Sequence, residues 1–430
     1  MRTTHIYKPQ NILAFKKQLL LWAQQFNEVV WLDSNSYNQA YSSFDAVLAV
    51  DASTSIQTNY KEAFNKLKAY QTEVNDWIFG YLTYDLKNGI ENLVSNNFDG
   101  LRFPDLYFFQ PKKLFLFKDE TVEIKYLHFL KHEVKEDLKA INFFEDKTPL
   151  NTTKPVKIKL RIHKDAYFEK VSKMLEHIKH GSIYEANFCQ EFYAENTTIN
   201  PLETYCKLNA ISGPPFATFV KFHNKYVMSA SPERYIKKED STVISQPIKG
   251  TAKRSKNKHE DYVLKSNLSN DEKERSENIM IVDLVRNDLS KTAIKGSVQV
   301  KELCKIYTFE QVHQMISTVT SQVETSTHPV DIIKTTFPMG SMTGAPKISA
   351  MKIIETLEDT KRGIYSGAIG YFTPNNDFDF NVVIRSILYN ATKKYVSYSV
   401  GSAITSKSDP LKEYEECLVK AKAMREVLEG

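Results

Sequence analysis

The stretch from residue 242 to residue 251 reads Thr242-Val243-Ile244-Ser245-Gln246-Pro247-Ile248-Lys249-Gly250-Thr251. Its first four residues, 242–245, have the β-branched and apolar character that predicts a strand. Pro247 restricts the backbone and Gly250 permits a left-handed conformation, so the sequence predicts that Lys249 is held at a turn of defined shape. A lysine placed in this way can act as a nucleophile, although most lysines beside turns are exposed charges.

Helical and strand patterns alternate on both sides of this stretch. Apolar residues recur at helical spacing over 167–180, 271–289, 347–358 and 409–428. Ser408 or Asp409 followed by Pro410 is typical of a helix start. Strand-like runs cover 44–50, 77–84, 219–228, 363–373, 380–389 and 395–404. This alternation predicts a mixed α/β fold in which sheets pack against helices.

The composition is that of an ordinary globular protein. The chain has 430 residues, of which 42% are hydrophobic and 25% charged, and its formal net charge is +5. It contains no basic patch interleaved with aromatic residues and no run of roughly 18 apolar residues, so we expect neither nucleic acid nor a membrane as a partner. The four cysteines form no CxxC pair, and no signal peptide precedes them, which predicts a cytoplasmic setting.

The best candidate for a linker lies at 131–157, which is rich in lysine and glutamate and contains Pro149 and Pro155. We therefore expect an N-terminal region at 1–150 and a C-terminal region at 158–430. The chain is long enough for both regions to share a large buried core. We expect them to be intertwined in one globular unit.

Two acidic pairs are predicted to lie on helices. Glu274 and Glu277 are three residues apart on one helix, and Glu413 and Glu416 are three residues apart on another. Residues at this spacing share a helix face, so each pair can direct two carboxylates to one point. If the helices meet, the four carboxylates would form a cup suited to Mg²⁺, which prefers oxygen ligands. Each pair taken singly is more typical of a solvated helix face.

A glycine-rich segment at 337–347 precedes one of the predicted helices. It contains Ser341, Thr343 and Lys347. Backbone N–H groups at a helix start, together with hydroxyls and a lysine, form a natural site for a carboxylate. The segment lacks the spacing of a phosphate-binding P-loop.

Two further features suggest contact with a ligand. Gly401, Ser402 and Ala403 end a predicted strand with small side chains, which would let a ligand approach the backbone. Arg385 lies on the predicted strand at 380–389 and could clamp a carboxylate with two hydrogen bonds. A surface ion pair is the alternative for Arg385.

These motifs, in this order along the chain, resemble those of the chorismate-utilising enzymes. The resemblance covers about residues 160–428, and more weakly 41–45 and 79–86. It implies an α+β fold in which two antiparallel-rich sheets pack as a sandwich, with helices on the outside. The matching segments are Gly181–Phe188, Ser229–Arg234, Pro247–Thr251, Glu274–Asp288, Gly340–Lys347, Arg385 and Glu413–Lys420.

The resemblance also implies roles for single residues. Glu277 and Glu416 would bind Mg²⁺, with Glu274 and Glu413 lining the metal site. Glu233 would be the general acid that protonates the departing C4 hydroxyl of chorismate, although an ordinary ion pair with Arg234 is the alternative. The residues expected at the substrate are Gly250, Thr251, Ser341, Thr343, Lys347, Tyr365, Arg385, Gly401, Ser402, Ala403 and Lys420.

Lys249 distinguishes the branches of this family. At the positions that match 247–250, anthranilate synthases carry a sequence similar to Pro-Ile-Ala-Gly. The aminodeoxychorismate synthase branch carries lysine in place of the alanine. The resemblance implies that Lys249 attacks C2 and expels the C4 hydroxyl, after which ammonia attacks C4 and expels Lys249. The attacking amine must be neutral, so we expect Mg²⁺ and other positive groups to lower its pKa.

Three positions depart from the patterns of the relatives. Glu185 occupies the position at which isochorismate synthases carry a lysine. The aminating branch is expected to carry glutamine at this position. His313 lies one residue before Gln314, which aligns with a histidine associated with pyruvate elimination in anthranilate synthases. Neighbouring residues on a strand or helix point in different directions, which favours amination without elimination. Ala403 replaces a commoner glycine and would narrow the pocket.

The expected substrates are chorismate and ammonia, with a separate glutamine amidotransferase subunit as the ammonia source. No amidotransferase-like or fused lyase region is recognisable, so another enzyme would finish 4-aminobenzoate for folate synthesis. One alternative is component I of anthranilate synthase. Another is a catalytically silent sensor that binds tryptophan in the N-terminal region, near Asp33, Ser34 and residues 41–43.

Overall fold

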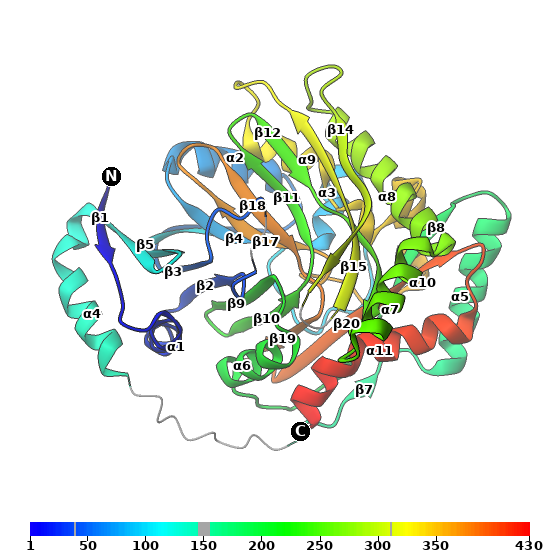
Figure 1. Ribbon diagram of the computed structural model, residues 1–430, viewed down its shortest axis with the longest axis horizontal. Helices are drawn as coiled ribbons and strands as arrows, with labels where there is room; N and C mark the ends of the chain where they lie inside the picture. Colours follow the sequence, from blue (N-terminus) through cyan, green and yellow to red (C-terminus); the bar gives the residue numbers. More distant parts are fainter. Residues whose placement is uncertain (38–39, 145–154, 310–311) are drawn as a thin grey trace.

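The computed structural model describes residues 1–37, 40–144, 155–309 and 312–430. Its strands pair antiparallel in one continuous network, which divides at β5 (Leu106–Lys118) into two parts, called here the first and the second sheet. This long strand pairs with β3 (Ala46–Thr58) and β6 (Thr121–Leu127) in one sheet and with β4 (Ile78–Leu82) in the other. Figure 1 shows both sheets side by side, with helices around them.

The first sheet contains strands from both ends of the chain. Beyond β3 it continues with β2, β9, β10, β19, β20 and β8, and β1 pairs with β6 at the opposite edge. The two short strands β7 and β16 flank β8. The bounds are β1 (Arg2–Tyr7), β2 (Glu28–Asp33), β7 (Lys159–Leu160), β8 (Glu185–Ala194), β9 (Phe216–Phe222), β10 (Lys225–Ser231), β16 (Gly344–Ala345), β19 (Ser386–Asn390) and β20 (Tyr395–Thr405).

The second sheet leads to the stretch around Lys249. From β4 it continues through β17, β18, β11, β12 and β15, and both β13 and β14 pair with β15. The bounds are β11 (Arg234–Glu239), β12 (Thr242–Ser245), β13 (Ile248–Lys253), β14 (Gln299–Thr308), β15 (Val312–Gln322), β17 (Ala368–Phe372) and β18 (Phe378–Val382).

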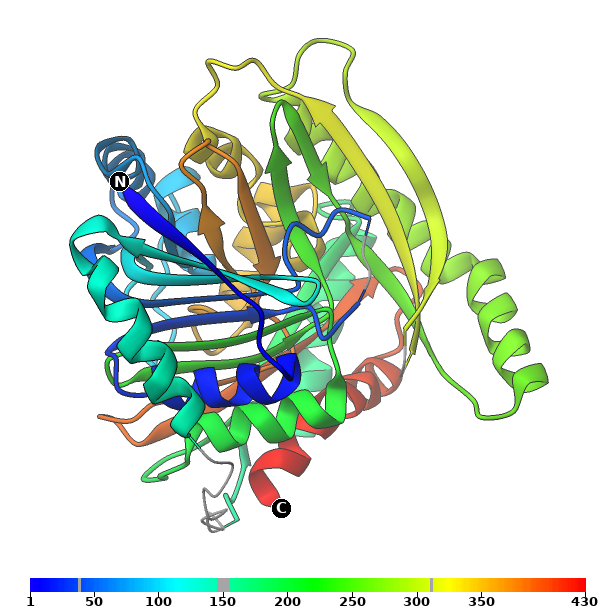
Figure 2. The ribbon, with the colours of Figure 1, turned by 60° about the vertical axis from the view of Figure 1, so that its left-hand side comes forward.

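Helices cover the outer faces of both sheets. Side chains of α1, α4, α5, α6, α10 and α11 join the core beneath the first sheet, and those of α2, α8 and α9 join the core of the second. Figure 2 shows α1, α6 and α11 along one face of the first sheet. The bounds are α1 (Ile12–Ala23), α2 (Ala63–Val74), α3 (Lys87–Ile90), α4 (Val134–Phe143), α5 (Lys164–Lys179), α6 (Pro201–Ser212), α7 (Lys258–Asn270), α8 (Glu272–Ser290), α9 (Pro329–Thr336), α10 (Lys347–Leu357) and α11 (Pro410–Glu429).

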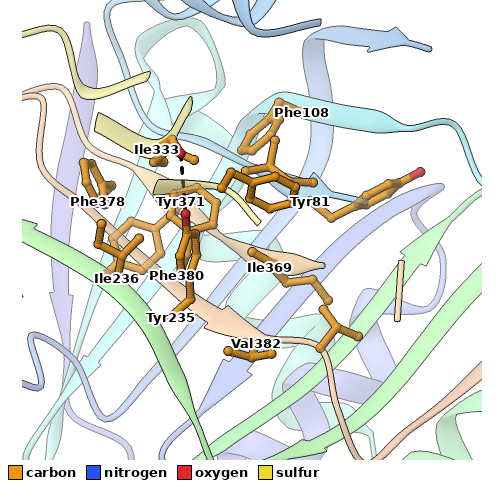
Figure 3. Close-up of a cluster of buried hydrophobic side chains, with 14 of the residues drawn as sticks. Tyr81, Phe108, Tyr235, Ile236, Ile333, Ile369, Tyr371, Phe378, Phe380 and Val382 are labelled. Carbon is orange, nitrogen blue, oxygen red and sulfur yellow. Dashed lines mark hydrogen bonds between the residues drawn. The ribbon is translucent and has the colours of Figure 1, made fainter. Parts of the chain in front are cut away.

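One continuous core contains apolar side chains from the two sheets and from α9 (Figure 3). Tyr81 of β4 and Phe380 of β18 are fully buried within it. The Tyr235 hydroxyl donates a hydrogen bond of 3.5 Å to the Ile333 carbonyl, which ties β11 to α9. This packing confirms the predicted α+β fold with antiparallel-rich sheets and outer helices.

The four helices predicted from apolar spacing are confirmed as α5, α8, α10 and α11. The Asp409 side chain accepts hydrogen bonds from the backbone N–H groups of Leu411 and Lys412, as expected of an N-cap. Gly181 follows α5 with a φ of 77°, which suits a residue without Cβ.

Three expectations about local structure are wrong. The run 219–228 is a hairpin of β9 and β10, because the chain turns at His223, whose φ is 53°. The run 380–389 is divided into β18 and β19, so Arg385 lies in the connection between strands, with a φ of 53°. The expected linker contains helix α4, which buries Val134 and Ile141. Residues 145–154 of that linker lie outside the described part.

Both sheets combine strands from 1–150 with strands from 158–430, so the two regions are intertwined. Among the described residues, no helix has the length and apolar character required to cross a membrane.

Candidate active site

Lys249 lies in a β-bulge of β13, and not in a turn after the strand at 242–245 as expected. Ile248 pairs with Ile316 on β15, whereas Thr251 pairs with Gln314, so β13 contains one more residue than its partner between these pairs. Gly250 has a φ of 85°, which favours a residue without a side chain. The bulge therefore redirects the Lys249 side chain relative to a regular strand.

The Lys249 amine is buried in an acidic environment. Its Nζ lies 2.9 Å from Oε1 of Glu185, and the two side chains are 11% and 2% exposed. Burial lowers the pKa of Lys249, but the charges of Glu185 and Glu277 raise it above its ordinary value. The expectation of a lowered pKa for Lys249 is therefore wrong in the environment that the protein alone provides, because carboxylates surround the amine. The exposed-lysine alternative is also excluded.

Glu233 lies in the link between β10 and β11 and its carboxyl group is buried. Burial raises its pKa to about 7, although a hydrogen bond with Ser341, the charge of Lys249 and the backbone N–H of Ile248 oppose this shift. The alternative of a Glu233–Arg234 pair does not hold, because Arg234 instead contacts Asp379 at 3.0 Å. A carboxylic acid with a pKa near neutrality suits general acid catalysis.

The two acidic pairs face each other from α8 and α11. Lys273 lies between them, with its Nζ 3.8 Å from Oε1 of Glu277 and 3.4 Å from Oε1 of Glu413. The pKa of Glu274 is raised by burial and by the charge of Glu416, which shows that these side chains are close as well. The predicted meeting of two helices that carry acidic pairs is thus present in the structure.

The carboxylates of α8 and α11 carry the negative charge that a divalent cation would require. Burial raises the pKa of Glu277 to about 7, and its Oε1 atom has no hydrogen-bond partner among the described residues. No group of three or more His, Cys, Asp or Glu side chains in the described part is close enough to form a ready metal site. Lys273 supplies the neutralising charge in this arrangement. A hard cation would provide the orphaned oxygen with a partner.

Ser402 and Lys420 support this acidic cup. The Ser402 hydroxyl donates a hydrogen bond to Oε2 of Glu413. Lys420 lies 2.6 Å from Glu416 and also donates to the Gly401 carbonyl at 2.9 Å. Both side chains therefore organise carboxylates of α11 beside the end of β20.

Arg385 and Tyr365 lie together near this end of the site. The electrostatic neighbours of the half-buried Arg385 guanidinium are Tyr365 and Glu416, and burial lowers its pKa. Within the described part, the guanidinium has no hydrogen bond or ion pair that would satisfy it. The Tyr365 hydroxyl accepts a hydrogen bond from Cys189 Sγ at 3.8 Å. Arg385 therefore remains available for a carboxylate.

Three small or short residues allow close packing around the site. A Cβ atom at Gly401 would lie 2.3 Å from Oδ1 of Asn187, so no larger residue fits there. A Cβ at Gly250 would lie 3.1 Å from Oε2 of Glu274, which brings β13 next to α8. Ala403 is paired with Asn187 across the sheet, and Thr251 is exposed on β13.

In the glycine-rich segment, the Lys347 and Thr343 side chains bind other parts of the protein and not the carboxylate that the sequence predicted for them. Lys347 forms an ion pair with Asp288 and donates a hydrogen bond of 3.0 Å to the Thr336 carbonyl. The Thr343 hydroxyl bonds within its own loop, to the carbonyl of Gly340 at 3.2 Å. Of the three polar side chains, Ser341 alone reaches the site, through Glu233. Lys347 is paired with the buried Asp288. The two residues are far apart in the sequence, so the spacing of residues could not reveal this pair.

His313 points away from Lys249, as predicted. Its Nε2 lies 3.0 Å from Oδ1 of Asp261 on α7, and its Nδ1 lies 3.0 Å from the Thr308 hydroxyl. Gln314 points to the opposite face of the strand, since side chains alternate along β15. Oε1 of Gln314 is buried and has no hydrogen-bond partner among the described residues.

Sequence reasoning missed two groups. Lys273 is four residues before Glu277 on α8, a spacing that could have identified it as a partner of that carboxylate. The second group is a buried ion pair that contacts β8. Arg362 lies 2.7 Å from Glu358 and donates a hydrogen bond of 2.7 Å to the Asn187 carbonyl of that strand. The i and i+4 spacing of this pair was also visible in the sequence, but its burial was not.

A cavity lies apart from Lys249, between the start of β3 and β9. Its walls include Asp33, Ser34, Ser43 and Arg234. Asp33 is already paired with Lys16 at 2.9 Å, whereas the Ser34 hydroxyl is buried without a partner in the described part. Of the residues expected near a tryptophan site, Asp33, Ser34, Ser42 and Ser43 line this cavity.

The sequence profile of chorismate binding enzymes matches residues 27–426. The chain belongs to this family of chorismate binding enzymes. An aminodeoxychorismate synthase of Streptomyces griseus is 41% identical over 283 residues, which are 65% of this chain and 38% of that protein. The chain thus spans little more than a third of the length of that relative.

Relatives of similar length represent two branches of the chorismate binding enzymes. Component 1 of aminodeoxychorismate synthase from Bacillus subtilis is 33% identical over 368 residues, or 81% of this chain and 76% of that protein. The crystal structure of anthranilate synthase component I from Streptococcus pneumoniae superposes with a TM-score of 0.80. It is 25% identical, and the match covers 90% of this chain and 93% of that one.

Proposed function

We propose that this protein is the synthase component of an aminodeoxychorismate synthase. It adds ammonia at C4 of chorismate and releases water, which yields 4-amino-4-deoxychorismate for 4-aminobenzoate and folate synthesis. The observation that carries the proposal is the buried amine of Lys249, which lies 2.9 Å from Glu185 and close to Glu233. A buried amine beside a carboxylic acid supplies the nucleophile and the proton donor that two successive displacements require.

In the first displacement, the lone pair of neutral Lys249 forms a bond to C2 of the ring. The double bonds shift, the C4–O bond breaks, and Glu233 donates its proton to the departing hydroxyl, which leaves as water. The raised pKa of Glu233, about 7, keeps part of this carboxyl group protonated at neutral pH. Ammonia then bonds to C4, the double bonds shift back, and the C2–N bond breaks, so Lys249 departs with its electron pair.

The remaining residues bind and orient the substrate. The free guanidinium of Arg385, next to Tyr365, would form two hydrogen bonds to the enolpyruvyl carboxylate. Glu277 and Glu416 would hold Mg²⁺, with Glu274 and Glu413 around it. When bound, this ion would neutralise the ring carboxylate and orient it.

The proposed ammonia source is a separate glutamine amidotransferase subunit. The designation of the Bacillus subtilis relative as component 1 supports a second component in such systems. The proposed setting is the cytoplasm, where reducing conditions would maintain the four cysteines as the free thiols seen here.

A second candidate function is that of anthranilate synthase component I, because the Streptococcus pneumoniae structure superposes over nearly the whole chain. Lys249 and the engagement of His313 with Asp261 favour amination at C4 instead. The cavity near Ser34 favours tryptophan binding as an additional property. A catalytically silent tryptophan sensor remains as the alternative to both enzymes.

The deciding experiment is incubation of the purified protein with chorismate, ammonium and Mg²⁺, followed by chromatography and mass spectrometry. We expect 4-amino-4-deoxychorismate to form and retain its enolpyruvyl group. Sole formation of fluorescent anthranilate would select the second candidate, and isochorismate alone would exclude both. Calorimetry with tryptophan, performed on the same preparation, identifies the sensor if binding occurs without turnover.

A further inference from the structure

Glu185 occupies a rigid position at the start of β8. Its backbone pairs with Ala345 of β16 on one side and with Thr405 of β20 on the other. A Cβ atom on Gly344 would lie 2.1 Å from the Glu185 carbonyl, so this close strand approach depends on glycine. A carboxylate fixed in this way can hold a flexible lysine in one place.

The Glu185 side chain makes a single polar contact in the described part of the chain. Oε1 accepts a hydrogen bond of 2.9 Å from Nζ of Lys249, and Oε2 is buried without a partner. Burying a carboxylate without full hydrogen bonding is unfavourable, so the fold tolerates this group at a cost in stability. Such uncompensated groups concentrate at functional sites.

The contact selects one partner for the lysine among several carboxylates. Glu233 from the β10–β11 link and Glu277 from α8 also act on Lys249 electrostatically, but Glu185 alone forms an ion pair with it among the described residues. Lys273 acts on Glu277 from α8 itself. The other charged groups that face this cluster are Glu274 and Glu416.

We propose that Glu185 is a positioning residue for the amination: its carboxylate holds the Lys249 amine in the site and takes the proton that this amine must lose before it attacks chorismate. The inference rests on the proposed function and specifies how its nucleophile is prepared. A glutamine in the same place could hold the amine but could not remove its proton at neutral pH.

The proton transfer conserves charge within the pair. One N–H bond of the Lys249 ammonium group breaks and one O–H bond of Glu185 forms, which leaves a neutral amine and a neutral carboxylic acid. The amine lone pair is then free to bond to C2. When ammonia expels Lys249, the amine departs neutral and takes the proton back from Glu185. No proton enters or leaves the solvent in this exchange, so the step does not require a base from the solvent.

The test is Glu185→Gln, which preserves the size of the side chain and its ability to accept a hydrogen bond. Rates are measured with saturating chorismate and Mg²⁺ over a range of pH, with the concentration of free ammonia held constant. We expect kcat to fall by about 100-fold or more, while KM for chorismate changes by less than about threefold. Below about pH 7, where Glu233 remains protonated, we also expect kcat of the variant to rise with pH, by up to about tenfold per unit, because solvent must now remove the proton.

Glu191→Gln is the matched control, since Glu191 is a buried carboxylate on the same strand that pairs with Arg161 at 3.1 Å. It should leave kcat and its pH dependence unchanged. Should Glu185→Gln fail to fold, Glu185→Asp takes its place, with a reduced kcat and a pH profile of wild-type shape. Wild-type kcat and pH dependence in Glu185→Gln, or a rate that rises steadily with pH in Glu185→Asp, would overturn the inference.

A second measurement requires no turnover and so separates this inference from the proposed function. Lys249 in the unliganded protein is labelled with acetic anhydride at pH 8, and the extent of labelling is read by mass spectrometry. Because Glu185 favours the protonated amine, Glu185→Gln should be labelled at least about fivefold faster than wild type. Equal labelling would show that Glu185 does not control the amine.

Discussion

Lys273 on α8 lies 3.4 Å from Glu413 on α11, and this ion pair joins the two helices that carry the acidic pairs. The same amine lies 3.8 Å from Glu277, so a single positive charge is shared by carboxylates of both helices. The proposed Mg²⁺ ion would bring its charge to the same group of oxygens. The lysine and the cation are therefore expected to compete electrostatically.

Lys273→Met should strengthen Mg²⁺ binding because it removes this competing charge. A change of about 1 kcal/mol corresponds to an activation constant for Mg²⁺ that is about fivefold lower. Without Mg²⁺ the variant should melt at a lower temperature than wild type, since its carboxylates repel one another. Lys412→Met, on an exposed position of α11, serves as the control. An unchanged or weaker Mg²⁺ dependence would contradict electrostatic competition.

Lys249→Met should abolish amination, by about 1000-fold or more, because no amine remains to attack C2. Binding of chorismate and Mg²⁺, measured by calorimetry, should persist. Lys253→Met is a suitable control, as Lys253 is an exposed lysine on the same strand. If the Lys249 variant retains amination, ammonia attacks chorismate directly and the covalent route is wrong.

The protonation of Glu233 should make kcat decline at alkaline pH. As a general acid it must be protonated, and its pKa is raised to about 7 by burial, so kcat should fall as pH rises above this value. The same shift makes folding more favourable at low pH, and this contribution is lost as pH rises from the ordinary pKa of the group toward 7. Glu233→Gln should lose activity at all pH values but retain more of its stability at pH 8. The rate is measured at constant free ammonia, and stability by urea unfolding at pH 5 and pH 8.

Lys347 provides a test of the structure against the sequence expectation. Because Lys347 is buried in an ion pair with Asp288, Lys347→Met should lower the free energy of unfolding by about 3–5 kcal/mol, as expected when one partner of a buried pair is lost. KM for chorismate should be unchanged in the fraction that remains folded. A large increase in KM with normal stability would instead restore the predicted role in carboxylate binding. Urea unfolding and steady-state kinetics on one preparation distinguish the two results.

Much of the local structure could be predicted from short patterns in the chain. Helices α5, α8, α10 and α11 follow from apolar spacing, and each acidic pair follows from the i, i+3 geometry of its helix. The strand runs were less informative, because the turns at His223 and Arg385 contain neither glycine nor proline. Both turns use a left-handed backbone at a residue other than glycine, which local patterns do not reveal.

The partners of the charged groups could not be predicted in the same way. Lys249 and Glu185 are 64 residues apart, and Lys347 and Asp288 are 59 residues apart. The pairing of these charged side chains depends on how strands and helices pack. The periodicity of the sequence does not predict it. The resemblance to known relatives predicted that Lys249 is a nucleophile, whereas the residue types at 337–347 placed Lys347 at a carboxylate site.

By itself, the sequence determined the class of fold, the helices that carry the acidic pairs and the lysine that distinguishes this chain from anthranilate synthase patterns. These properties depend on residue type and near-neighbour spacing, which a linear chain displays directly. Only the tertiary structure decided that Lys249 is paired with Glu185, that Lys273 bridges the two acidic helices, and that the Arg385 side chain has no partner among the described residues. Burial and long-range packing control the energies of these charges, and both arise only when distant segments of the chain come together.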